Sequence, residues 1–454
     1  MTAAPPPLSR AVVDRPAVPV RIVHVGLGAF HRAHQAWYTD AVDAECEWGI
    51  AAVTGRSPRA AEDLAAQDGL FTVIERSADG DAATIVGSIT EAVDGADVDR
   101  LVELIASPGT AIITITITEP GYRLTSDGSP DLGDEAVVAD LAALAEGRAP
   151  RTAMGRLLRG LAARRDADAG PVAVVPCDNM PDNGTLVARG LRRIAERVDP
   201  GLAEWIDEHV SFVSTSVDRI TPKTTEADLA TAAELTGFRD AAAVVTEPFR
   251  DWVLCGDFPA GRPAWERAGA RFVDDIEPFE RRKLWLLNGS HSLLAYAGRL
   301  RGHETVAAAI ADPVCRGWVE DFWDEAVRHL PAGLDLPDYR AALLARYDNA
   351  RIEHRLAQIG MEGATKLRVR IVPTLLAERA AGRSGTACIR ALATWVVLHR
   401  RGEDLPDARR EAIDRVLAGP EHAVEAGLLA LVDERIAADE GIVADVRAAV
   451  SALT

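Results

Sequence analysis

The sequence contains little cysteine and no long apolar run. Its cysteines, Cys46, Cys177, Cys255, Cys315 and Cys388, are widely spaced, odd in number and without a CxxC pair. This pattern argues against a disulfide framework and predicts reduced thiols in a cytoplasmic protein. No apolar run approaches the ~20 residues that a membrane helix needs, and the N-terminal stretch lacks the apolar core of a signal peptide. We therefore expect a cytoplasmic protein with no membrane segment.

Positive charge is also scarce, because 50 Lys and Arg stand against 69 Asp and Glu, for a formal net charge of −19. This balance argues against general nucleic-acid binding, which depends on cations that meet phosphates. A local basic pocket for a small anion remains open. The 454 residues exceed the ~250–300 at which one hydrophobic core stops growing, so at least two domains are expected.

The pattern of apolar residues divides the chain near residue 275. From residue 20, β-branched runs alternate with helical stretches, which predicts a doubly wound α/β domain with a mostly parallel, Rossmann-like sheet. The residues that follow form long helical stretches and predict an all-α domain. The strands are expected at 20–25, 48–54, 71–76, 83–89, 110–118 and 171–176, with helices at 57–67 and 97–106.

Three parts of the chain are therefore predicted. Residues 1–16 are rich in proline and are expected to be a mobile tail outside the fold. Residues 17–275 form the dinucleotide-binding domain, and residues 276–454 form the helical substrate and catalytic domain. The Pro- and Gly-rich stretch 256–275 is interpreted as the linker between the two domains.

The segment RIVHVGLGAFHRAHQ opens like a dinucleotide-binding turn. An apolar strand leads into Gly26 and Gly28, which would permit a tight turn and close backbone approach to a pyrophosphate. A helix that starts near Phe30 would direct its free N–H groups at that anion. The third glycine of the usual fingerprint is replaced by His31. A metal role for His31 with His34 is disfavoured, because no third ligand is near, and a histidine that is satisfied by hydrogen bonds or faces a phosphate is expected.

The second predicted strand ends without the acidic residue that usually selects NAD. The following stretch, TGRSPRAAE, offers Arg56 and Arg59 before its first acid, Glu62. An arginine at this place can accommodate the 2′-phosphate of NADP. The local chemistry therefore favours NADP, with solvated loop charges as the equal alternative.

The stretch KLWLLNGSH places Lys283, Asn288 and His291 in a segment that otherwise predicts an amphipathic helix. At ~1.5 Å rise and 3.6 residues per turn, the three fall within one broad arc over about 12 Å and can line one wall of a cleft. Apolar neighbours such as Leu284 would favour the neutral amine, which could serve as a general base. Each residue alone is better explained as a snorkelling lysine, a capping asparagine or a buried histidine, and only their combination indicates a site.

The motif Lys-x4-Asn-x2-His at 283–291 resembles the signature of the polyol-specific long-chain dehydrogenase/reductase family. The opening HVGLGAFHRAHQAWYTD is similar to the cofactor turn of that family, which also has histidine in the third-glycine place. Further similar stretches in collinear order are AAQDGLFTV, TITITEPGY, PCDNMPDNG, VDRITP and RLAQIGMEGATK. The resemblance thus extends from about residue 20 to about residue 375.

This resemblance implies a metal-independent, NAD-dependent oxidoreductase that interconverts a sugar alcohol and a ketose. Lys283 would take the alcohol proton as general base and return it in carbonyl reduction, and His291 would orient the substrate and the lysine. Asn179 and Asn288 would hydrogen-bond the reacting oxygen, so that alkoxide charge meets fixed donors. Glu280 would connect the base to solvent.

Other matched positions would bind the remaining hydroxyls and the cofactor. Asp218, Gln358 and Lys366 match substrate-binding positions, and Arg370 is a further candidate for binding substrate. The family is mostly NAD-linked, so NAD is expected, with NADP left open. The residues expected to bind the cofactor are Gly26, Gly28, Ala29, Phe30, His31, Arg56, Thr118 and Glu119.

The choice of substrate depends on the rim of the pocket, where the chain departs from the family. Glu362, Ala364 and Arg368 stand where MDGSQK and KLPQR are frequent in the family. Arg355, Arg368 and Arg370 could bind a carboxylate or phosphate, or could lie on the surface. D-mannitol and D-fructose are the expected pair, with D-mannonate and D-fructuronate or mannitol 1-phosphate as alternatives. A non-catalytic nucleotide-binding protein is disfavoured, because the base and the oxyanion donors are all present. The resemblance suggests a monomer.

Overall fold

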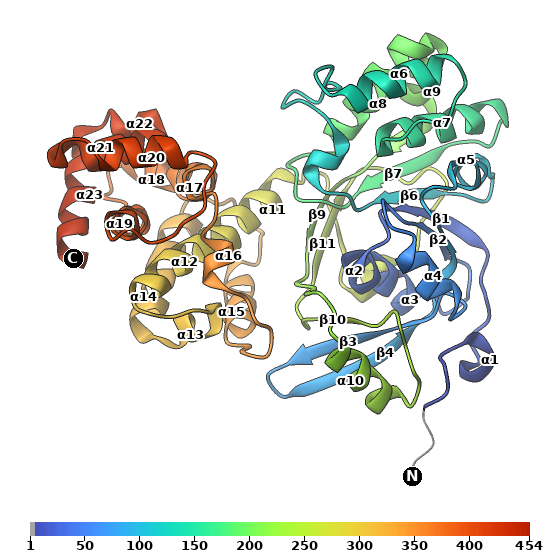
Figure 1. The fold of residues 1–454 in the computed structure, drawn as a ribbon, viewed down its shortest axis with the longest axis horizontal. Coiled ribbons are helices and arrows are strands. Elements are labelled where there is room, and N and C mark those ends of the chain that lie inside the picture. The colour runs from blue at the N-terminus through green and yellow to red at the C-terminus, as the bar shows by residue number, and fades with distance from the viewer. Residues whose placement is uncertain (1–4) are drawn as a thin grey trace. The chain divides into compact units, whose positions relative to one another are not determined.

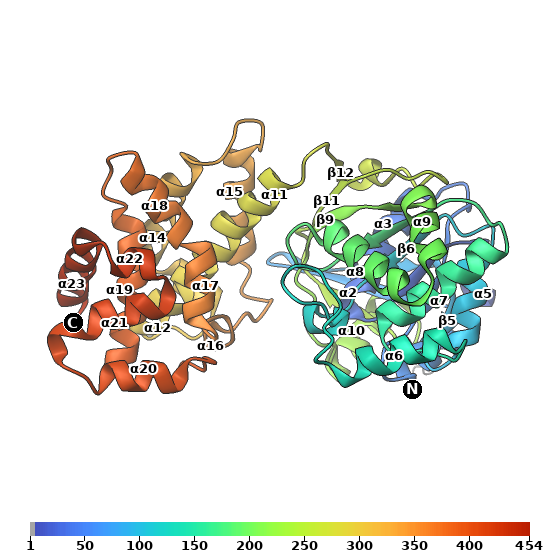
Figure 2. The ribbon, with the colours of Figure 1, turned by 90° about the horizontal axis from the view of Figure 1, so that it is seen from above.

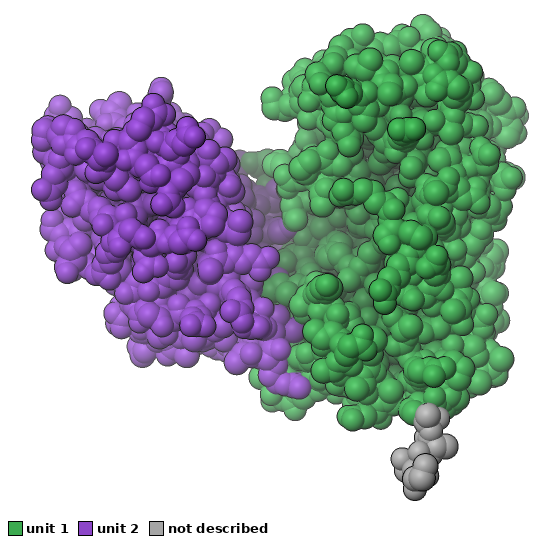
Figure 3. All heavy atoms as spheres, viewed as in Figure 1, with its two compact units in different colours: residues 1–277 green, residues 278–454 purple. Residues whose placement is uncertain are grey.

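The computed structural model describes residues 5–454, which divide into two compact units (Figure 3). Unit 1 ends at Glu277 and unit 2 begins at Pro278, two residues beyond the predicted boundary. No helix in the described part of the chain combines the length and the apolar character that crossing a membrane requires.

Unit 1 is built on a parallel six-stranded sheet with the order β5-β2-β1-β6-β7-β8. Figure 1 labels β1, β2, β6 and β7 of this sheet, and Figure 2 labels β5. In this order β1 and β6 are neighbours, although a long stretch of chain separates them. The chain reverses direction across the sheet at this point, where α/β folds open a crevice at the carboxyl ends of the strands. The predicted Rossmann-like sheet is confirmed. Its strands are β1 (Val20–Val25), β2 (Gly49–Val53), β5 (Ile89–Val93), β6 (Ile112–Ile115), β7 (Val172–Pro176) and β8 (Val210–Phe212).

Successive residues of the central strands enter two separate apolar clusters. Ile22 and Ile112 belong to one cluster, and Val23 and Ile113 belong to the other. Both faces of the sheet are therefore buried, which explains its nearly continuous runs of β-branched residues. The helices of this unit are α1 (Arg10–Val13), α2 (Ala29–His31), η1 (Arg32–Ala36), α3 (Trp37–Val42), α4 (Arg59–Ala65), α5 (Val98–Ala106), η2 (Glu119–Tyr122), α6 (Glu135–Ala145), α7 (Ala153–Asp166), α8 (Asn183–Val198), α9 (Pro200–His209), α10 (Glu226–Thr236) and η3 (Trp265–Ala268).

Two of the expected strands do not join the main sheet. β3 (Phe71–Ser77) and β4 (Gly80–Val86) form an antiparallel hairpin, which pairs with β10 (Val244–Thr246) in a separate three-stranded sheet. The prediction of parallel pairing was wrong here, because two residues between the strands allow a hairpin but not a crossover. A third small sheet contains β9 (Ser214–Asp218), β11 (Asp251–Cys255) and β12 (Arg271–Phe272).

The predicted mobile tail is wrong for residues 5–16, and residues 1–4 lie outside the described part. Leu8 is fully buried, and its N–H donates to Arg239 O at 2.9 Å. The Arg10 guanidinium donates to the carbonyls of Pro16, Gly87 and Ile89 at 2.6–2.9 Å. Proline content suggested disorder, but one buried leucine and one arginine with distant partners hold this segment on unit 1.

The stretch interpreted as a linker is also folded. Trp265 is fully buried, its Nε1 donates to Thr39 Oγ1 at 3.1 Å, and the Arg262 guanidinium stacks 3.5 Å from the Phe272 ring. Aromatic anchors therefore fix this Pro- and Gly-rich stretch within unit 1.

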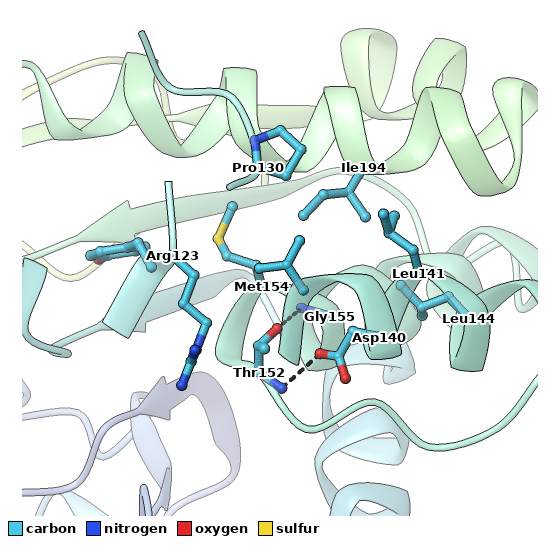
Figure 4. A pocket seen from close by; sticks show the side chains of 11 residues that line it. Arg123, Pro130, Asp140, Leu141, Leu144, Thr152, Met154, Gly155 and Ile194 are labelled. Carbon is cyan, nitrogen blue, oxygen red and sulfur yellow. Dashed lines mark hydrogen bonds between the residues drawn. The ribbon is translucent and has the colours of Figure 1, made fainter. Parts of the chain in front are cut away.

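The outer layer formed by α6, α7 and α8 is closed by polar caps and apolar side chains (Figure 4). The Asp140 carboxylate accepts the backbone N–H groups of Arg151 and Thr152 at 2.7 Å, and the Thr152 hydroxyl accepts that of Gly155 at 3.1 Å. Met154 and Ile194 fill the space beside them, and the cavity that remains has only about 10 Å³. This region serves packing, since no substrate fits there.

Unit 2 is all-α, as predicted. Its centre contains α12 and α19, whose side chains are mostly buried. The helices are α11 (Glu277–Arg282), η4 (Lys283–Gly289), α12 (Ser290–Leu300), α13 (Val306–Ala311), α14 (Pro313–Val327), α15 (Leu336–Tyr347), α16 (Leu356–Ile359), α17 (Gly363–Arg370), α18 (Val372–Ala380), α19 (Thr386–Arg400), α20 (Arg410–Leu417), η5 (Glu421–Ala423), α21 (Val424–Val432), α22 (Glu434–Ala437) and α23 (Glu440–Leu453).

Candidate active site

The turn after β1 has the backbone geometry that its first glycine predicts. Gly26 has φ +108°, and a Cβ at this position would lie 2.2 Å from Thr116 O. The N–H groups of Gly26 and Leu27 both donate to Val53 O at 2.9 Å. The neighbouring strands therefore hold the turn from both sides, and only glycine fits at its first position.

Gly28 differs, because packing within the chain does not require a glycine there. Its φ of −146° suits any residue, and a Cβ would meet only Gly26 O, at an ordinary 3.6 Å. Ala29, Phe30 and His31 form the first helical residues after it, and their N–H groups have no carbonyl four residues earlier within the helix. A small residue at Gly28 thus leaves this open row of donors accessible to a phosphate.

The His31 side chain does not reach this surface. It is fully buried and stacks on His24, with 3.3 Å between ring centroids and 7° between planes. The phosphate-facing ring and the ring satisfied by hydrogen bonds, both considered from the sequence, are therefore wrong, because neither ring nitrogen bonds to a described residue. Only the backbone N–H of His31 remains available to an anion. Burial lowers the pKa of His24 to about 3 and, together with the neighbouring ring, holds the pKa of His31 well below its usual value.

These two neutral histidines predict a loss of stability in acid. The unfolded chain binds protons on both rings below about pH 6.5 and the folded chain does not, so stability falls as the pH decreases from there toward the folded pKa values. Urea unfolding should show a lower free energy at about pH 5 than at about pH 7.5. His31→Phe keeps a flat ring but cannot titrate, so it should lose about 2 kcal/mol less over this range. An equal loss in both proteins would contradict this assignment.

A cleft in unit 1 contains several of the predicted residues. Phe30, Thr118, Glu119, Asn179 and Asp218 line one cavity of about 530 Å³ at the carboxyl ends of β1, β6, β7 and β9. Asn179, Thr118 and Glu119 are exposed, and Asp218 is half-buried. The topology therefore brings together five predicted positions that are spread over almost two hundred residues of sequence.

Arg219 also lines this cleft and was missed, although it follows Asp218 directly in the same motif. It is buried, donates to Glu247 O and Ala33 O at 3.1 and 2.5 Å, and pairs with Glu75. Its bonds join η1 to β3 and to the residue that follows β10. Its position next to the predicted Asp218 was the available signal, and its partners indicate a structural role in fixing the cleft wall.

The loop that carries Asn179 is rigidly held by its neighbours. Asp178 accepts the Tyr122 hydroxyl at 2.6 Å and the Met180 N–H at 2.8 Å. Asn183 accepts the Thr215 N–H at 2.8 Å, which ties the loop to β9. These bonds fix the backbone on both sides of Asn179 while its side chain stays exposed.

The end of β2 presents Arg56 to solvent. The Thr54 hydroxyl accepts the Gly95 N–H at 2.8 Å, so it is already engaged, while Arg56 is exposed and has no bonded partner in the described part of the chain. Arg59 forms only a loose pair with Asp63, at 3.7 Å. Arg56 is therefore the free cation at this position.

In unit 2, Lys283 and Asn288 do not lie on the regular α-helix that was predicted, whereas His291 lies on an α-helix. Residues Lys283–Gly289 form the π-helix η4, and α12 follows directly from Ser290. A π-helix pairs residues five apart, and Lys283 and Asn288 are five apart, so the wider turn brings both to one side. Lys283 and Asn288 are half-buried. Glu280 lies one turn earlier, in α11.

The wider turn is stabilised from the buried side. Ser290 Oγ donates to Leu286 O at 2.5 Å and is 2.8 Å from the Tyr347 hydroxyl, and Trp323 Nε1 donates to Leu286 O at 2.8 Å. A Cβ on Gly289 would lie 2.7 Å from the Phe322 ring. Tertiary contacts therefore select the π-helix, which local sequence periodicity could not predict.

His291 lies at the edge of this helix with an unpaired ring nitrogen. It is buried, its ring centroid is 5.0 Å from that of Tyr347 and 4.9 Å from that of His354, and its Nε2 makes no hydrogen bond to any described residue. Burial and nearby cationic groups hold its pKa well below the usual value. A neutral imidazole with a free nitrogen can exchange a hydrogen bond with a substrate hydroxyl.

Two predicted cations lie beside this helix. Arg370 Nη1 donates to Asn288 O at 3.3 Å and to Ser292 Oγ at 3.1 Å, and its other nitrogens make no hydrogen bond within residues 5–454. Lys366 Nζ donates to Ile359 O at 2.9 Å, and burial together with Arg370 lowers the pKa of Lys366 to about 8. Gln358 lies exposed on α16, on the segment that leads to Lys366.

The other arginines considered as anion ligands are placed differently. Arg355 pairs with Glu353 at 2.6 Å, and Arg368 is exposed on α17. Glu362, at the start of that helix, binds the Ala408 N–H with both carboxylate oxygens at 3.1 Å, and Ala364 is fully buried. Among the described residues, no three His, Cys, Asp or Glu side chains are arranged to hold a metal.

Comparison with known proteins places the chain in a family. The profile of the mannitol dehydrogenase Rossmann domain matches residues 20–267, and that of the mannitol dehydrogenase C-terminal domain matches residues 275–453. A D-mannonate oxidoreductase of Escherichia coli K12 is 36% identical over 425 residues, 91% of this chain and 86% of the relative. A mannitol 2-dehydrogenase of Cereibacter sphaeroides is 36% identical over 397 residues, 86% of this chain and 82% of the relative.

A solved structure agrees with this placement. Mannitol 2-dehydrogenase of Pseudomonas fluorescens, in a ternary complex with NAD and D-mannitol, matches with a TM-score of 0.79 and 33% identity over 98% of this chain and 96% of that one. The chain belongs to the mannitol dehydrogenase family.

Proposed function

We propose that this protein is a metal-independent, NAD-dependent oxidoreductase that interconverts a sugar alcohol and a ketose. The observation that carries the proposal is the π-helix, which brings Lys283 and Asn288 to one side and ends next to the buried, unpaired Nε2 of His291. A base, an amide donor and a neutral imidazole are the groups that oxidation of a secondary alcohol needs at its reacting oxygen.

Lys283 is the proposed general base. The sequence holds only three lysines, Lys223, Lys283 and Lys366, and two of them lie in this part of unit 2. Arginine supplies nearly all other cations and does not deprotonate, so a lysine is expected where a proton must be exchanged. Lys283 takes the alcohol proton, Asn288 and Asn179 donate hydrogen bonds to the oxygen, and His291 orients the substrate. Glu280 is proposed to connect the lysine to solvent.

The turn at Gly26–His31 fits a dinucleotide. No packing contact within the chain requires a glycine at position 28, and the N–H groups that follow it are open to a pyrophosphate. Phe30, Thr118 and Glu119 line the adjoining cleft and are proposed to contact the nicotinamide half. When bound, the cofactor accepts the hydride of the alcohol or delivers it to the ketone.

D-mannitol and D-fructose are the proposed pair, with Asp218, Gln358 and Lys366 binding the other hydroxyls. D-mannonate with D-fructuronate is the second candidate, because Arg370 lies beside Asn288 with free guanidinium nitrogens that could bind a carboxylate. Overall identity does not separate the two candidates, since relatives named for either substrate are both 36% identical to this chain.

The substrate is tested with the variants Arg370→Met and Arg368→Met, assayed for NADH oxidation with D-fructose and D-fructuronate. If the carboxylate is bound by Arg370, its loss should raise the KM for fructuronate about tenfold or more, since a charge-assisted bond is lost. The exposed Arg368 is the matched control and should leave both substrates unaffected. Faster wild-type turnover of fructose at low concentration, with similar effects of Arg370→Met on both substrates, would exclude the uronate.

A second variant tests the choice of cofactor. Arg56→Glu should leave NADH oxidation largely intact and abolish any use of NADPH, because the free cation at the end of β2 is the group that would meet a 2′-phosphate. The ratio of kcat/KM for the two cofactors is the measurement. An equal loss with both cofactors would contradict this role of Arg56.

The proposed setting is a monomer in the cytoplasm. All cysteines, Cys46, Cys177, Cys255, Cys315 and Cys388, are free, as suits a reducing compartment. Sedimentation equilibrium at micromolar concentration would test the monomer.

A further inference from the structure

A chain of hydrogen bonds runs through a buried histidine beneath the cofactor turn. His24 of β1 lies next to Thr114 of β6 in the sheet register. Its Nδ1 is 2.8 Å from Thr114 Oγ1, and its Nε2 is 3.0 Å from Thr116 Oγ1. Thr116 Oγ1 in turn donates to Gly26 O at 2.9 Å. This series of hydrogen bonds therefore ends on the carbonyl of Gly26, the glycine that begins the turn.

The direction of these bonds follows from the number of protons. The Gly26 carbonyl can only accept, so the single hydroxyl proton of Thr116 lies in that bond. His24 Nε2 must then carry the hydrogen that it donates to Thr116. Its Nδ1 is left as the acceptor of the Thr114 hydroxyl. All three bonds point the same way, and together they select one tautomer of His24.

His31, in helix α2, packs against this series of hydrogen bonds. In a Rossmann turn the third glycine lets helix and strand approach closely. Here the His31 ring fills that place and stacks on His24 at 3.3 Å, and the helix continues as the π-helical η1. The distance between helix and strand is thus set by two stacked rings, which explains why a histidine can replace a glycine in this fingerprint.

We propose that Thr114, His24 and Thr116, supported by His31, form a positioning relay for the cofactor turn. The relay fixes the Gly26 carbonyl, and with it the path of the backbone that binds the dinucleotide. Gly26 adopts φ +108°, and glycine is the residue with the most conformational freedom, so an external restraint has the largest effect there. The inference rests on the proposed function in taking residues 26–31 as the cofactor turn.

Isosteric variants of Thr114 test the relay, because this residue is buried beneath the turn. Thr114→Val keeps the shape but removes the hydrogen bond to His24, and it should raise the Kd for NADH about five- to tenfold with kcat at saturating NADH unchanged. Thr114→Ser restores the donor and should bind NADH like the wild type. Wild-type affinity in Thr114→Val, or equally weak binding in Thr114→Ser, would overturn the proposal.

The imidazole ¹⁵N spectrum of the full chain without cofactor reports the tautomer of His24 directly. His24 should show the Nε2–H tautomer in the wild type and in His31→Phe, and should lose this preference in Thr116→Val and His31→Gly. A wild-type protein that binds NADH but shows the Nδ1–H tautomer would overturn the relay alone. The Nε2–H tautomer in a protein that binds no NADH would overturn the proposed function, and the positioning role with it.

Discussion

Replacement of Lys283 by alanine should reduce kcat for ketose reduction by about 10²–10⁴-fold, with little change in the affinity for NADH. The variant removes the amine that exchanges the proton, while the cofactor turn lies in unit 1 and is untouched. Steady-state kinetics at neutral pH, with NADH binding measured separately by fluorescence, separates the two effects. Added primary amines should restore part of the lost rate, because they can enter the space left by the side chain.

The matched control is Lys223→Ala, which removes a lysine of unit 1 to which no catalytic or binding role is assigned. It should behave like the wild type. If Lys283→Ala kept the wild-type rate, or if the two lysine variants lost activity equally, Lys283 would not be the base. A loss that amines cannot restore, accompanied by a lower unfolding temperature, would instead indicate a structural lysine.

Gly26→Ala should mainly lower the stability of the protein, whereas Gly28→Ala should mainly weaken the binding of NADH. At Gly26 the new methyl group would lie 2.2 Å from Thr116 O on a backbone with positive φ, so the unfolding free energy should fall by roughly 3 kcal/mol or more. At Gly28 the methyl group fits the chain, so stability should change by less than about 1 kcal/mol. NADH affinity should nevertheless fall about tenfold or more in Gly28→Ala, since the methyl group blocks backbone approach to the pyrophosphate.

Urea unfolding and NADH titration of the two variants together provide the measurement. Each variant serves as the control for the other, because they add the same group two residues apart. Normal NADH binding by a stable Gly28→Ala protein would contradict the placement of the pyrophosphate. A stable Gly26→Ala protein would contradict the geometry of the turn.

Features that depend on neighbouring residues in sequence could be predicted. The strands at β1, β2, β6 and β7 follow from runs of β-branched residues, and their place in a parallel sheet follows from alternation with helices. The presence of Lys283, Asn288 and His291 on one helical segment also follows from spacing. The residues of the unit 1 cleft were predicted individually, by resemblance, and the sheet order explains why they meet.

Features that depend on distant partners could not be predicted. The π-helix at Lys283–Gly289 is stabilised by two partners that are distant in sequence. Trp323 donates to the carbonyl of Leu286, and the Tyr347 hydroxyl hydrogen-bonds to Ser290, which follows the helix. Leu8 and Arg10 fix the N-terminal segment in the same way, through contacts with residues far along the chain. His31 differs, because its stacking partner His24 lies in the same short segment of sequence, but the spacing of the fingerprint does not indicate that the two rings stack.

The most direct test of the proposed function follows the transferred hydrogen itself. NADH deuterated at the transferred position of its nicotinamide is incubated with the purified protein and either D-fructose or D-fructuronate, and the reduced product is examined by NMR. We predict that deuterium appears on the new carbinol carbon of one product, and that this transfer is lost in Lys283→Ala. Consumption of NADH without deuterium in the sugar product, or no turnover of either ketose, would contradict it.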